Sequence, residues 1–339
     1  MSRDLAITGT GAVSPAGWGV GPLMESLRSS TMPAAGLLER ASGEHSVSTT
    51  VLRVPPDNGR VPKAARLRRT SPISKFAAAA AMEALGETRL RQISEGLRVG
   101  VILTLTNGCV NYSNRFFGEV LADPAMASPI LFPETVFNAP SSHLSAMIGS
   151  TAPNDSLIGD GSGFLTGIDL AAEWLERGDV DGCLVVAAEE IDWLSAEALR
   201  LYSRALVPSE GAGAIYLEMG EGSAIIEALP DPVSFTGRNR MEAALQLRGG
   251  LSLADDGSTL LVDSRSGIRG FDGPETAMWK DWTGPAWSPK QLLGDSMGAA
   301  AAFQVVAAVD ALKSGPWDQA VVSSMGSNQQ CAAMVLSKA

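Results

Sequence analysis

Residues 156–178, SLIGDGSGFLTGIDLAAEWLERG, form the stretch of this chain whose composition best suits chemistry. An apolar segment runs through closely spaced glycines into a helical pattern, and such strand-to-helix turns often hold nucleophiles or phosphates. Gly159, Gly161 and Gly163 lack the GxGxxG spacing of a dinucleotide loop, and no GK[ST] follows for a P-loop. Ser162 lies one place too late for a GxSxG nucleophile elbow. By generic motifs alone, this is a tight turn that needs glycine for close packing.

The chain offers few residues for metal or thiol chemistry. Its cysteines, Cys109, Cys183 and Cys331, show no CxxC spacing, and its two histidines are His45 and His143. This set argues against a zinc site, and we expect neither a metal nor a cofactor. The cysteine usage is typical of a reduced, cytoplasmic protein. No apolar run approaches the ~20 residues of a membrane span, and the start lacks the pattern of a signal peptide.

The charge of the chain is strongly acidic, with a formal net charge of −11 at pH 7. That value argues against a nucleic-acid surface. The local exception is the basic run RVPKAARLRR at residues 60–69. An acidic protein needs such a patch to dock an acidic partner, although a solvated charged loop would look the same.

Predicted strands and helices, which must position the glycine turn, alternate along the whole chain of 339 residues. Short apolar runs, typical of strands covered on both faces, occupy residues 5–13, 98–106, 155–160, 182–190, 211–219, 223–229, 258–265, 319–326 and 331–338. Helical patterns lie between them at residues 72–90, 164–177, 238–247 and 297–313. The alternation predicts an α/β fold with a largely parallel or mixed sheet.

The two parts of the chain repeat one unit. LERGDVDGCLVVAAEE begins at Leu175 and LKSGPWDQAVVSSMG begins at Leu312, and each has glycine three residues on and valine ten residues on. In both, a helical pattern ends at the glycine and a strand follows at the same distance. We interpret this as an internal duplication, with an N-terminal half at residues 1–220 and a C-terminal half at residues 221–339.

Six segments, taken in order, follow the pattern of one family. They are AITGTGAVSPAGWG, RRTSPISKFAAAAAMEAL, the region from NAPSSHLS to VVAAEE, VPSEGAGAIYLE, SPKQLLGDSMGAAAAFQVVAAVDALKSG and SSMGSNQQCAAMVL. Through them the chain resembles the β-ketoacyl synthases of the thiolase superfamily nearly end to end. The resemblance implies a thiolase-like fold, in which two duplicated βαβαβ halves form a five-layered αβαβα arrangement.

The family's reaction needs a cysteine at the N-terminus of a buried helix and two histidines. The cysteine takes an acyl chain from a carrier protein, and the histidines assist decarboxylation of a malonyl unit. The resemblance places Gly161 at the cysteine, Ser264 at the first histidine, Asp295 at the second and Lys290 at the family's lysine. The last histidine in the sequence is His143, which we interpret as structural, so no shift of the alignment restores either catalytic histidine.

Other residues around the empty nucleophile position are pocket candidates, namely Asp160, Ser162, Ser327 and Cys331. The resemblance implies that the backbone amides of Gly161 and Ser327 form the oxyanion hole, which survives substitution because it is made of backbone. Cys331 is either a displaced thiol or a small buried residue at the start of a strand. We expect Asp295 and Lys290 to form a buried ion pair.

With all three catalytic groups replaced, the resemblance implies a non-condensing subunit of a type II fatty-acid or polyketide system. It would be a partner like the chain-length factors, or an acyl- or acyl-carrier-binding protein, in a homodimer or in a heterodimer with an active ketosynthase. Residues 155–160 and 103–121 would form the dimer interface, and Arg68, Arg69 and Lys75 would dock an acyl carrier protein. The alternative is an acyltransferase or thioester hydrolase on the same scaffold, with Ser162 or Cys331 as its nucleophile.

Overall fold

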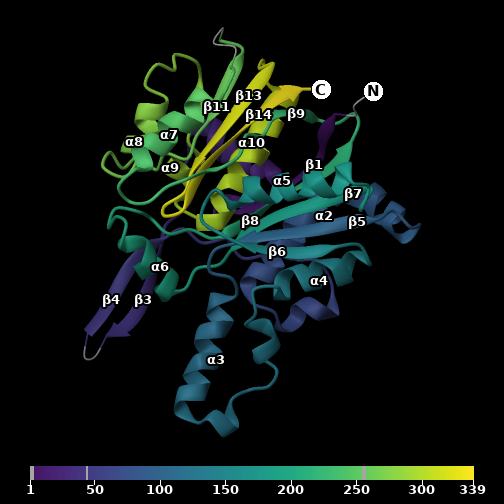
Figure 1. The fold of residues 1–339 in the computed structure, drawn as a ribbon. Helices are drawn as coiled ribbons and strands as arrows, with labels where there is room; N and C mark the ends of the chain where they lie inside the picture. The colour runs from purple at the N-terminus through teal and green to yellow at the C-terminus, as the bar shows by residue number, and fades with distance from the viewer. Residues whose placement is uncertain (1–3, 43–44, 254–256) are drawn as a thin grey trace.

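The computed structural model describes residues 4–42, 45–253 and 257–339, and its main feature is a long mixed sheet (Figure 1). The first half contributes β1 (Leu5–Ser14), β5 (Val99–Leu105), β6 (Asn154–Ile158), β7 (Gly182–Glu189) and β8 (Gly211–Met219). The second half contributes β9 (Ala224–Ala228), β11 (Thr259–Val262), β12 (Ala286–Trp287), β13 (Gln319–Met325) and β14 (Gln330–Lys338). Two short strands, β2 (Gly17–Trp18) and β10 (Val233–Ser234), pair with β1 and β14.

Both halves of the sheet have the same strand order. The first runs β6-β5-β7-β8-β1 and the second runs β12-β11-β13-β14-β9. In each, the first two pairings are parallel and the next two are antiparallel. The halves join where β1 pairs with β9, at Ala6 with Ile225 and Ile7 with Ala224. The duplication inferred from the repeated sequence therefore appears in the topology. The boundary at residues 220/221 stays a prediction; it falls in the loop between β8 and β9.

Helices cover the sheet in layers. The helices α5 (Gly163–Glu176) and α10 (Ala300–Ser314) lie between the two halves and carry the largest buried apolar cluster. The outer face of the first half is covered by α2 (Pro72–Ser94) and α4 (Ala139–Ile148), and that of the second by α7 (Arg240–Gly249) and α8 (Gly273–Met278). This is the five-layered αβαβα arrangement of a thiolase-like fold (Figure 1).

The helix α10 is apolar on all sides, and the structure explains why this is tolerated: protein surrounds the helix. Residues Met297–Ser314 have the length and hydropathy of a membrane span, and 83% of that stretch is buried inside the molecule. A helix that is hydrophobic all round and buried is a core helix of a large fold. The sequence pattern at residues 297–313 therefore corresponds to the central layer.

Several elements were not predicted. The strands β3 (Gly36–Ser42) and β4 (His45–Val51) form a separate hairpin, and the helices α1 (Val20–Ser29), α3 (Val110–Ala122), α6 (Trp193–Arg200) and α9 (Pro289–Leu293) lie in connecting segments. Short 3₁₀ turns are η1 (Ala65–Arg69), η2 (Pro124–Met126), η3 (Phe132–Glu134) and η4 (Met297–Ala299). The helix predicted at residues 72–90 continues to Ser94 through a break at Gly86, whose φ of 61° is outside the helical region.

Candidate functional site

Gly161, to which the resemblance assigns the nucleophile position, lies in the turn between β6 and α5. Phe164, Leu165 and Ile168 are buried, and they fix α5 against the sheet so that the turn stays in place. A Cβ atom built on Gly161 would lie 3.4 Å from the Met297 carbonyl oxygen and 3.9 Å from Lys290 Nζ. These are ordinary contact distances, so the position has room for a side chain and simply carries none.

A cavity of about 190 Å³ opens beside Gly161. Its walls bring together five residues singled out in the sequence, and these are Asp160, Gly161, Lys290, Asp295 and Ser327. Sequence analysis missed Thr106 and Asn107, which follow β5, as well as Leu199 and Tyr202 at the end of α6. A signal for the first pair existed: β5 and β6 are parallel neighbours, so their carboxyl ends meet at one edge. No pattern in the sequence indicates that α6 covers the cavity.

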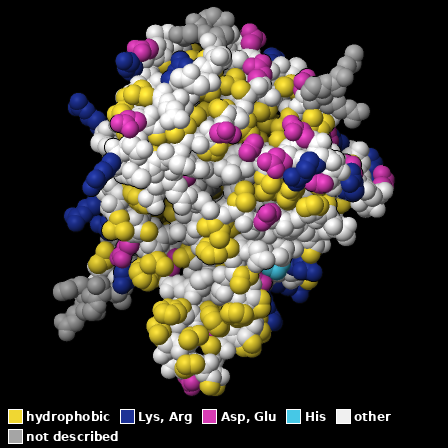
Figure 2. Space-filling model, viewed as in Figure 1, with side chains coloured by type: hydrophobic (Ala, Val, Ile, Leu, Met, Phe, Trp, Pro, Cys, Tyr) yellow, Lys and Arg dark blue, Asp and Glu magenta, His cyan; other side chains and the backbone are white. Residues whose placement is uncertain are grey.

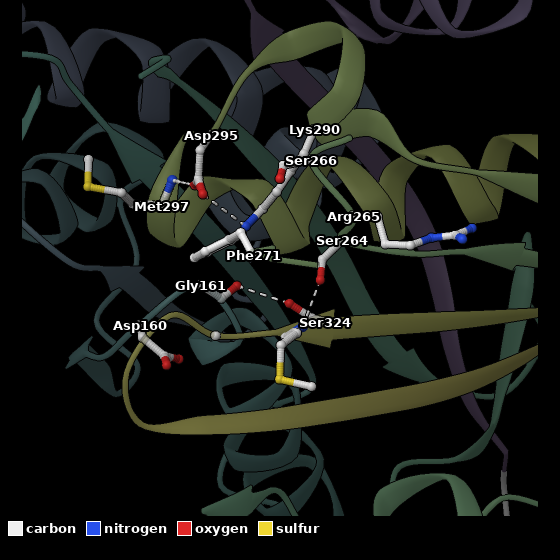
Figure 3. Close-up of polar contacts among 12 residues, drawn as sticks. Asp160, Gly161, Ser264, Arg265, Ser266, Phe271, Lys290, Asp295, Met297 and Ser324 are labelled. Atoms are coloured by element: carbon white, nitrogen blue, oxygen red, sulfur yellow. Dashed lines mark hydrogen bonds and ion pairs between the residues drawn. The ribbon is translucent and has the colours of Figure 1, made fainter. Parts of the chain in front are cut away.

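Lys290 and Asp295 form the ion pair that the sequence led us to expect (Figure 3). Lys290 Nζ donates to Asp295 Oδ2 at 3.2 Å, and the two side chains are 4% and 2% exposed. The other carboxylate oxygen, Oδ1, accepts from the Met297 amide at 2.8 Å. Lys290 therefore keeps Asp295 from being a buried charge without a partner, which would be costly.

Asp160 holds the loop between β13 and β14, residues 326–329, in place through hydrogen bonds. Its Oδ2 accepts from the amides of Asn328, Gln329 and Gln330 at 3.4, 2.9 and 3.3 Å. Its Oδ1 accepts from the amide and the hydroxyl of Ser162, at 3.2 and 3.0 Å. A Cβ on Gly326 of the same loop would lie 1.9 Å from Asp160 Oδ2, so this arrangement requires glycine there.

The two candidate replacement nucleophiles, Ser162 and Cys331, do not line the cavity. The Ser162 hydroxyl is fully buried and donates to Asp160. Cys331 packs in the outer apolar cluster under α7 and α8, with its Sγ 3.6 Å from the Val233 carbonyl oxygen. Burial raises the pKa of the Cys331 thiol to about 11, which disfavours the thiolate. This placement agrees with the interpretation of Cys331 as a small buried residue.

Ser264, which the resemblance assigns to the first histidine, lies outside the cavity lining and is 3% exposed. Its hydroxyl donates to Glu275 Oε2 at 2.6 Å and accepts from the Met325 amide at 2.8 Å. The neighbouring Ser324 donates from its hydroxyl to the Gly161 carbonyl oxygen at 3.2 Å (Figure 3). Burial and the charge of Asp263 raise the pKa of Glu275. Ser264 thus fastens the end of β13, which in turn contacts the glycine turn.

Behind the cavity wall lies another buried carboxyl group, that of Glu189 at the end of β7. It accepts from the amides of Thr106 and Asn107, the latter at 3.3 Å, and a Cβ on Gly298 would lie only 2.8 Å from Oε1. Burial raises the pKa of Glu189 to about 8, although the amides that bind its charged form lower it in part. The protonated form of Glu189 is therefore favoured up to about pH 8. Its hydrogen bonds hold Thr106 and Asn107 in place in the cavity wall.

The remaining predicted residues lie elsewhere. Arg68 and Arg69 are exposed on η1, Lys75 is half-buried in the first turn of α2, and none of the three forms an ion pair within the described residues. His143 Nε2 lies 3.0 Å from Glu134 Oε1, a contact between α4 and η3 that fits a structural role. Among the described residues, no group of three or more His, Cys, Asp or Glu side chains is placed to hold a metal ion.

The layered fold and the glycine turn beside a buried lysine define a thiolase-like protein. Residues 2–222 match the family model of the beta-ketoacyl synthase N-terminal domain. Because that match spans more than half of the chain, the protein belongs to the β-ketoacyl synthase family. Among curated proteins, none matches the sequence.

Solved structures share the fold over the whole chain at low sequence identity. The ishigamide ketosynthase/chain length factor is 19% identical with a TM-score of 0.83, and the match covers 99% of each chain. A ketosynthase in complex with its chain length factor from Xenorhabdus doucetiae is 15% identical with a TM-score of 0.80, covering 99% of this chain and 98% of that one. A beta-ketoacyl synthase from Burkholderia phymatum is 15% identical with a TM-score of 0.79, covering 100% of both. At these identities the likeness shows the fold.

Proposed function

We propose that this protein is a non-condensing β-ketoacyl-synthase-like subunit that pairs with an active ketosynthase. One observation carries the proposal: Gly161, Ser264 and Asp295 stand at the positions that the resemblance assigns to the catalytic groups. Gly161 has no side chain, and Ser264 and both oxygens of Asp295 are engaged in structural hydrogen bonds. Condensation by the family's route needs a thiolate and two imidazoles, and this cavity supplies none of them.

The similar structures support a partner-dependent role. One of them is described as a ketosynthase in complex with its chain length factor, and another as a type II polyketide synthase acyl-carrier protein in complex with its ketosynthase. Both are assemblies of several chains rather than isolated subunits. A chain of the same fold without the catalytic groups fits the place of the non-condensing member of such an assembly.

The surface of the first half supports an interface (Figure 2). Large apolar side chains are exposed on α3 and in the turns that follow it: Phe117 is 60% exposed, Leu121 71%, Met126 78% and Phe132 57%. Next to this region, β6 is an edge strand within the described sheet, and its Ile158 is 59% exposed. An exposed apolar patch beside an unpaired strand edge is typical of a protein–protein interface. We assign the ketosynthase contact to these residues, which we call the α3 surface.

Co-expression with the ketosynthase encoded nearest to this gene tests the pairing. A tag on one subunit should retain both subunits at a one-to-one ratio, and light scattering should give the mass of a heterodimer. The same ketosynthase with a tag alone is the control. Recovery of this chain only as a homodimer, with the ketosynthase in the flow-through, would reject the heterodimer.

The basic turn η1 is the proposed docking site for an acyl carrier protein. Arg68 and Arg69 are exposed and without ion-pair partners among the described residues, and Lys75 follows in the next turn of the chain. Positive charge on an acidic protein favours encounter with an acidic partner. Arg68→Glu with Arg69→Glu should weaken carrier binding at least tenfold in a titration at low salt. The matched control is Arg91→Glu on α2. Equal losses of carrier affinity in both variants would show that η1 is not the docking site.

The alternative function, acyl transfer or thioester hydrolysis, has less support from the geometry. Its nucleophiles, Ser162 and Cys331, lie outside the cavity, and no histidine lines the cavity to act as their base. Intact-mass measurement after incubation with acyl thioesters tests it. A covalent acyl adduct on either residue would revive this alternative.

A further inference from the structure

We infer that another cavity, at the carboxyl ends of β11 and β12, binds an uncharged planar ring with two adjacent hydrogen-bond acceptors, which is the chemistry of a guanine or cytosine base. Its volume is about 420 Å³, within the range of about 300–1,000 Å³ that is usual for small-molecule sites. It shares no lining residue with the cavity beside Gly161, with η1 or with the α3 surface. The inference therefore stands apart from the proposed function.

The place of this cavity in the fold is one where ligands commonly bind. Strands β11 and β12 are parallel neighbours. Arg265 lies three residues after the end of β11, and Ser288 and Gln291 lie just beyond the end of β12, so the walls come from the point where both strands end. In sheets with parallel strands, ligands bind in the crevice outside the carboxyl ends. The strand order makes this edge the counterpart, in the second half, of the β5–β6 edge beside Gly161.

Arg265 is held at the cavity by a buried carboxylate. Its Nε donates to Asp263 Oδ2 at 2.7 Å, and its backbone amide donates to Asp263 Oδ1 at 3.0 Å. The Asp263 side chain is 0% exposed and also accepts from the Ser288 hydroxyl at 2.6 Å, so its position is fixed. Figure 3 shows the Arg265 side chain pointing away from Lys290 and Asp295. The guanidinium group therefore serves this cavity and not the one beside Gly161.

One edge of the Arg265 guanidinium is free to bind a ligand. Asp263 contacts Nε and Nη2, which are the two nitrogens of one edge. Of the five N–H donors, both on Nη1 and one on Nη2 remain, and they form a parallel pair at the end of the group. Within the described residues Nη1 has no partner. Two parallel donors match two adjacent acceptors on a planar ring, as when arginine binds O6 and N7 of guanine.

The charges around Arg265 argue against an anionic ligand. Burial opposes the charge of this guanidinium, but Asp263, Glu275 and Asp272 outweigh it and raise the pKa of Arg265. Glu275 and Asp272 also act on Arg240, so two guanidinium groups face three carboxyl groups here. No positive charge is left over, and a carboxylate or phosphate would be repelled by the buried Asp263. The free donors therefore select an uncharged ligand.

The remaining walls suit a ring with polar substituents. Trp287 is half-buried and lines the cavity together with Leu27 and Leu292, which gives an aromatic and apolar surface for the faces of a ring. The side-chain amide of Gln291 and the hydroxyl of Ser30 also line the cavity, and neither makes a hydrogen bond in the part of the chain that the structure describes. They offer donors and acceptors to the groups that a base or its ribose carries.

Calorimetric titration of the full chain tests the inference with defined probes. The probes are cytidine, guanosine, uridine, adenosine, cytidine 5′-monophosphate, benzoate and glucose. Cytosine and guanine each have two adjacent acceptors, whereas in uracil an N–H separates the two carbonyls and in adenine an amino group lies beside N7. We expect cytidine and guanosine to bind at least tenfold more tightly than uridine and adenosine. The monophosphate should bind no more tightly than cytidine, because the site holds no spare positive charge.

Two variants test the residues. Arg265→Lys keeps a cation beside Asp263 but offers no parallel pair of donors, so it should fold and lose the preference for cytidine over uridine. Its matched control is Arg269→Lys, an exposed arginine of the same loop outside the cavity. Gln291→Ala removes an exposed side chain without a hydrogen-bond partner, so it should leave the fold intact and weaken cytidine binding at least threefold. Thermal unfolding of each variant checks that the chain is folded.

Several outcomes would overturn the inference. They are equal affinity for the four nucleosides, no binding of any probe, tighter binding of benzoate or of the monophosphate than of cytidine, and an unchanged preference in Arg265→Lys. Tighter binding of glucose than of cytidine would assign the cavity to a sugar and would equally reject the base. The tenfold preference for cytidine and guanosine, present in Arg269→Lys and lost in Arg265→Lys, would establish the site.

Discussion

Among the single residues, Asp160 has the most connected role in the site. It accepts hydrogen bonds from the consecutive amides of Asn328, Gln329 and Gln330, where the loop enters β14, and from both donors of Ser162. Removing a buried acceptor leaves its donors unpaired, so Asp160→Ala should lower the free energy of unfolding by about 3 kcal/mol. Chemical denaturation measures the loss, with Asp281→Ala, whose side chain is 90% exposed, as the control. Equal stability of Asp160→Ala and the wild type would contradict this role.

Glu189 makes the stability of the protein depend on pH. Its pKa is about 8 in the folded protein, because burial opposes the charge, and close to 4.5 in the unfolded chain. Between these values the folded state holds a proton that the unfolded state has lost. Stability should therefore fall as the pH rises from about 5 to 8, by up to about 1.4 kcal/mol per pH unit for this group. Urea unfolding across that range should show a flatter profile for Glu189→Gln than for Glu221→Gln on the surface.

Individual residues of the site were predictable to the extent that backbone spacing fixes them. The resemblance singled out Gly161, Lys290 and Asp295, which lie in the turn before α5, in α9 and in the loop after it, and the structure brings all three to one cavity. The directions in which the Ser162 and Cys331 side chains point could not be predicted from the sequence. Adjacent residues of a strand face opposite sides of the sheet, so Cys331 faces the outer layer and Ala332 the inner one.

Among the helices and strands, α3 carries most of the surface that we propose contacts the ketosynthase. Its apolar side chains point away from the chain's own core, so α3 was not recognisable as a helix that packs on the sheet. Phe117→Asp with Leu121→Glu should abolish association with the ketosynthase, because charges buried in an apolar interface are costly. The variant should remain folded, since both residues are exposed in the single chain.

The control for that prediction is Leu245→Glu on α7, a leucine that is 48% exposed on the opposite outer layer. Analytical ultracentrifugation of each variant with the ketosynthase measures the association. If Leu245→Glu disrupted the complex and the double variant of α3 did not, the interface would lie on the second half instead.

The other strands and helices follow the sequence closely where both faces are buried. All nine predicted strands are present, since continuous apolar runs between turn residues leave little choice of structure. The hairpin β3–β4 is different: it forms its own small sheet, and Arg40 of β3 stacks on Trp193 of α6 at 3.8 Å. Such contacts join segments about 150 residues apart, which no local pattern indicates.

For the whole molecule, the proposed function predicts that a cysteine at position 161 does not by itself give condensing activity. Gly161→Cys should fold, because a side chain at that position meets only ordinary contacts. It should still give no β-ketoacyl product with acyl and malonyl carrier substrates, since Ser264 and Asp295 remain and a thiol alone lacks its acid–base partners. Product detection by mass spectrometry checks both the wild type and the variant. Authentic condensation product from either chain would overturn the proposed function.

The duplicated sheet has a further consequence for how this chain could be rebuilt. Strand β9 pairs with β1 at Ala6 and with β14 at Ser337, both through Ile225, so these two residues lie about 10 Å apart across one strand. A linker of a few residues could join the two ends, and the loop between β8 and β9 could be opened in exchange. The resulting circular permutant would carry the second half first in its gene. Both strand orders would survive, because no strand pairing of the shared sheet runs through the connection at residues 220–223.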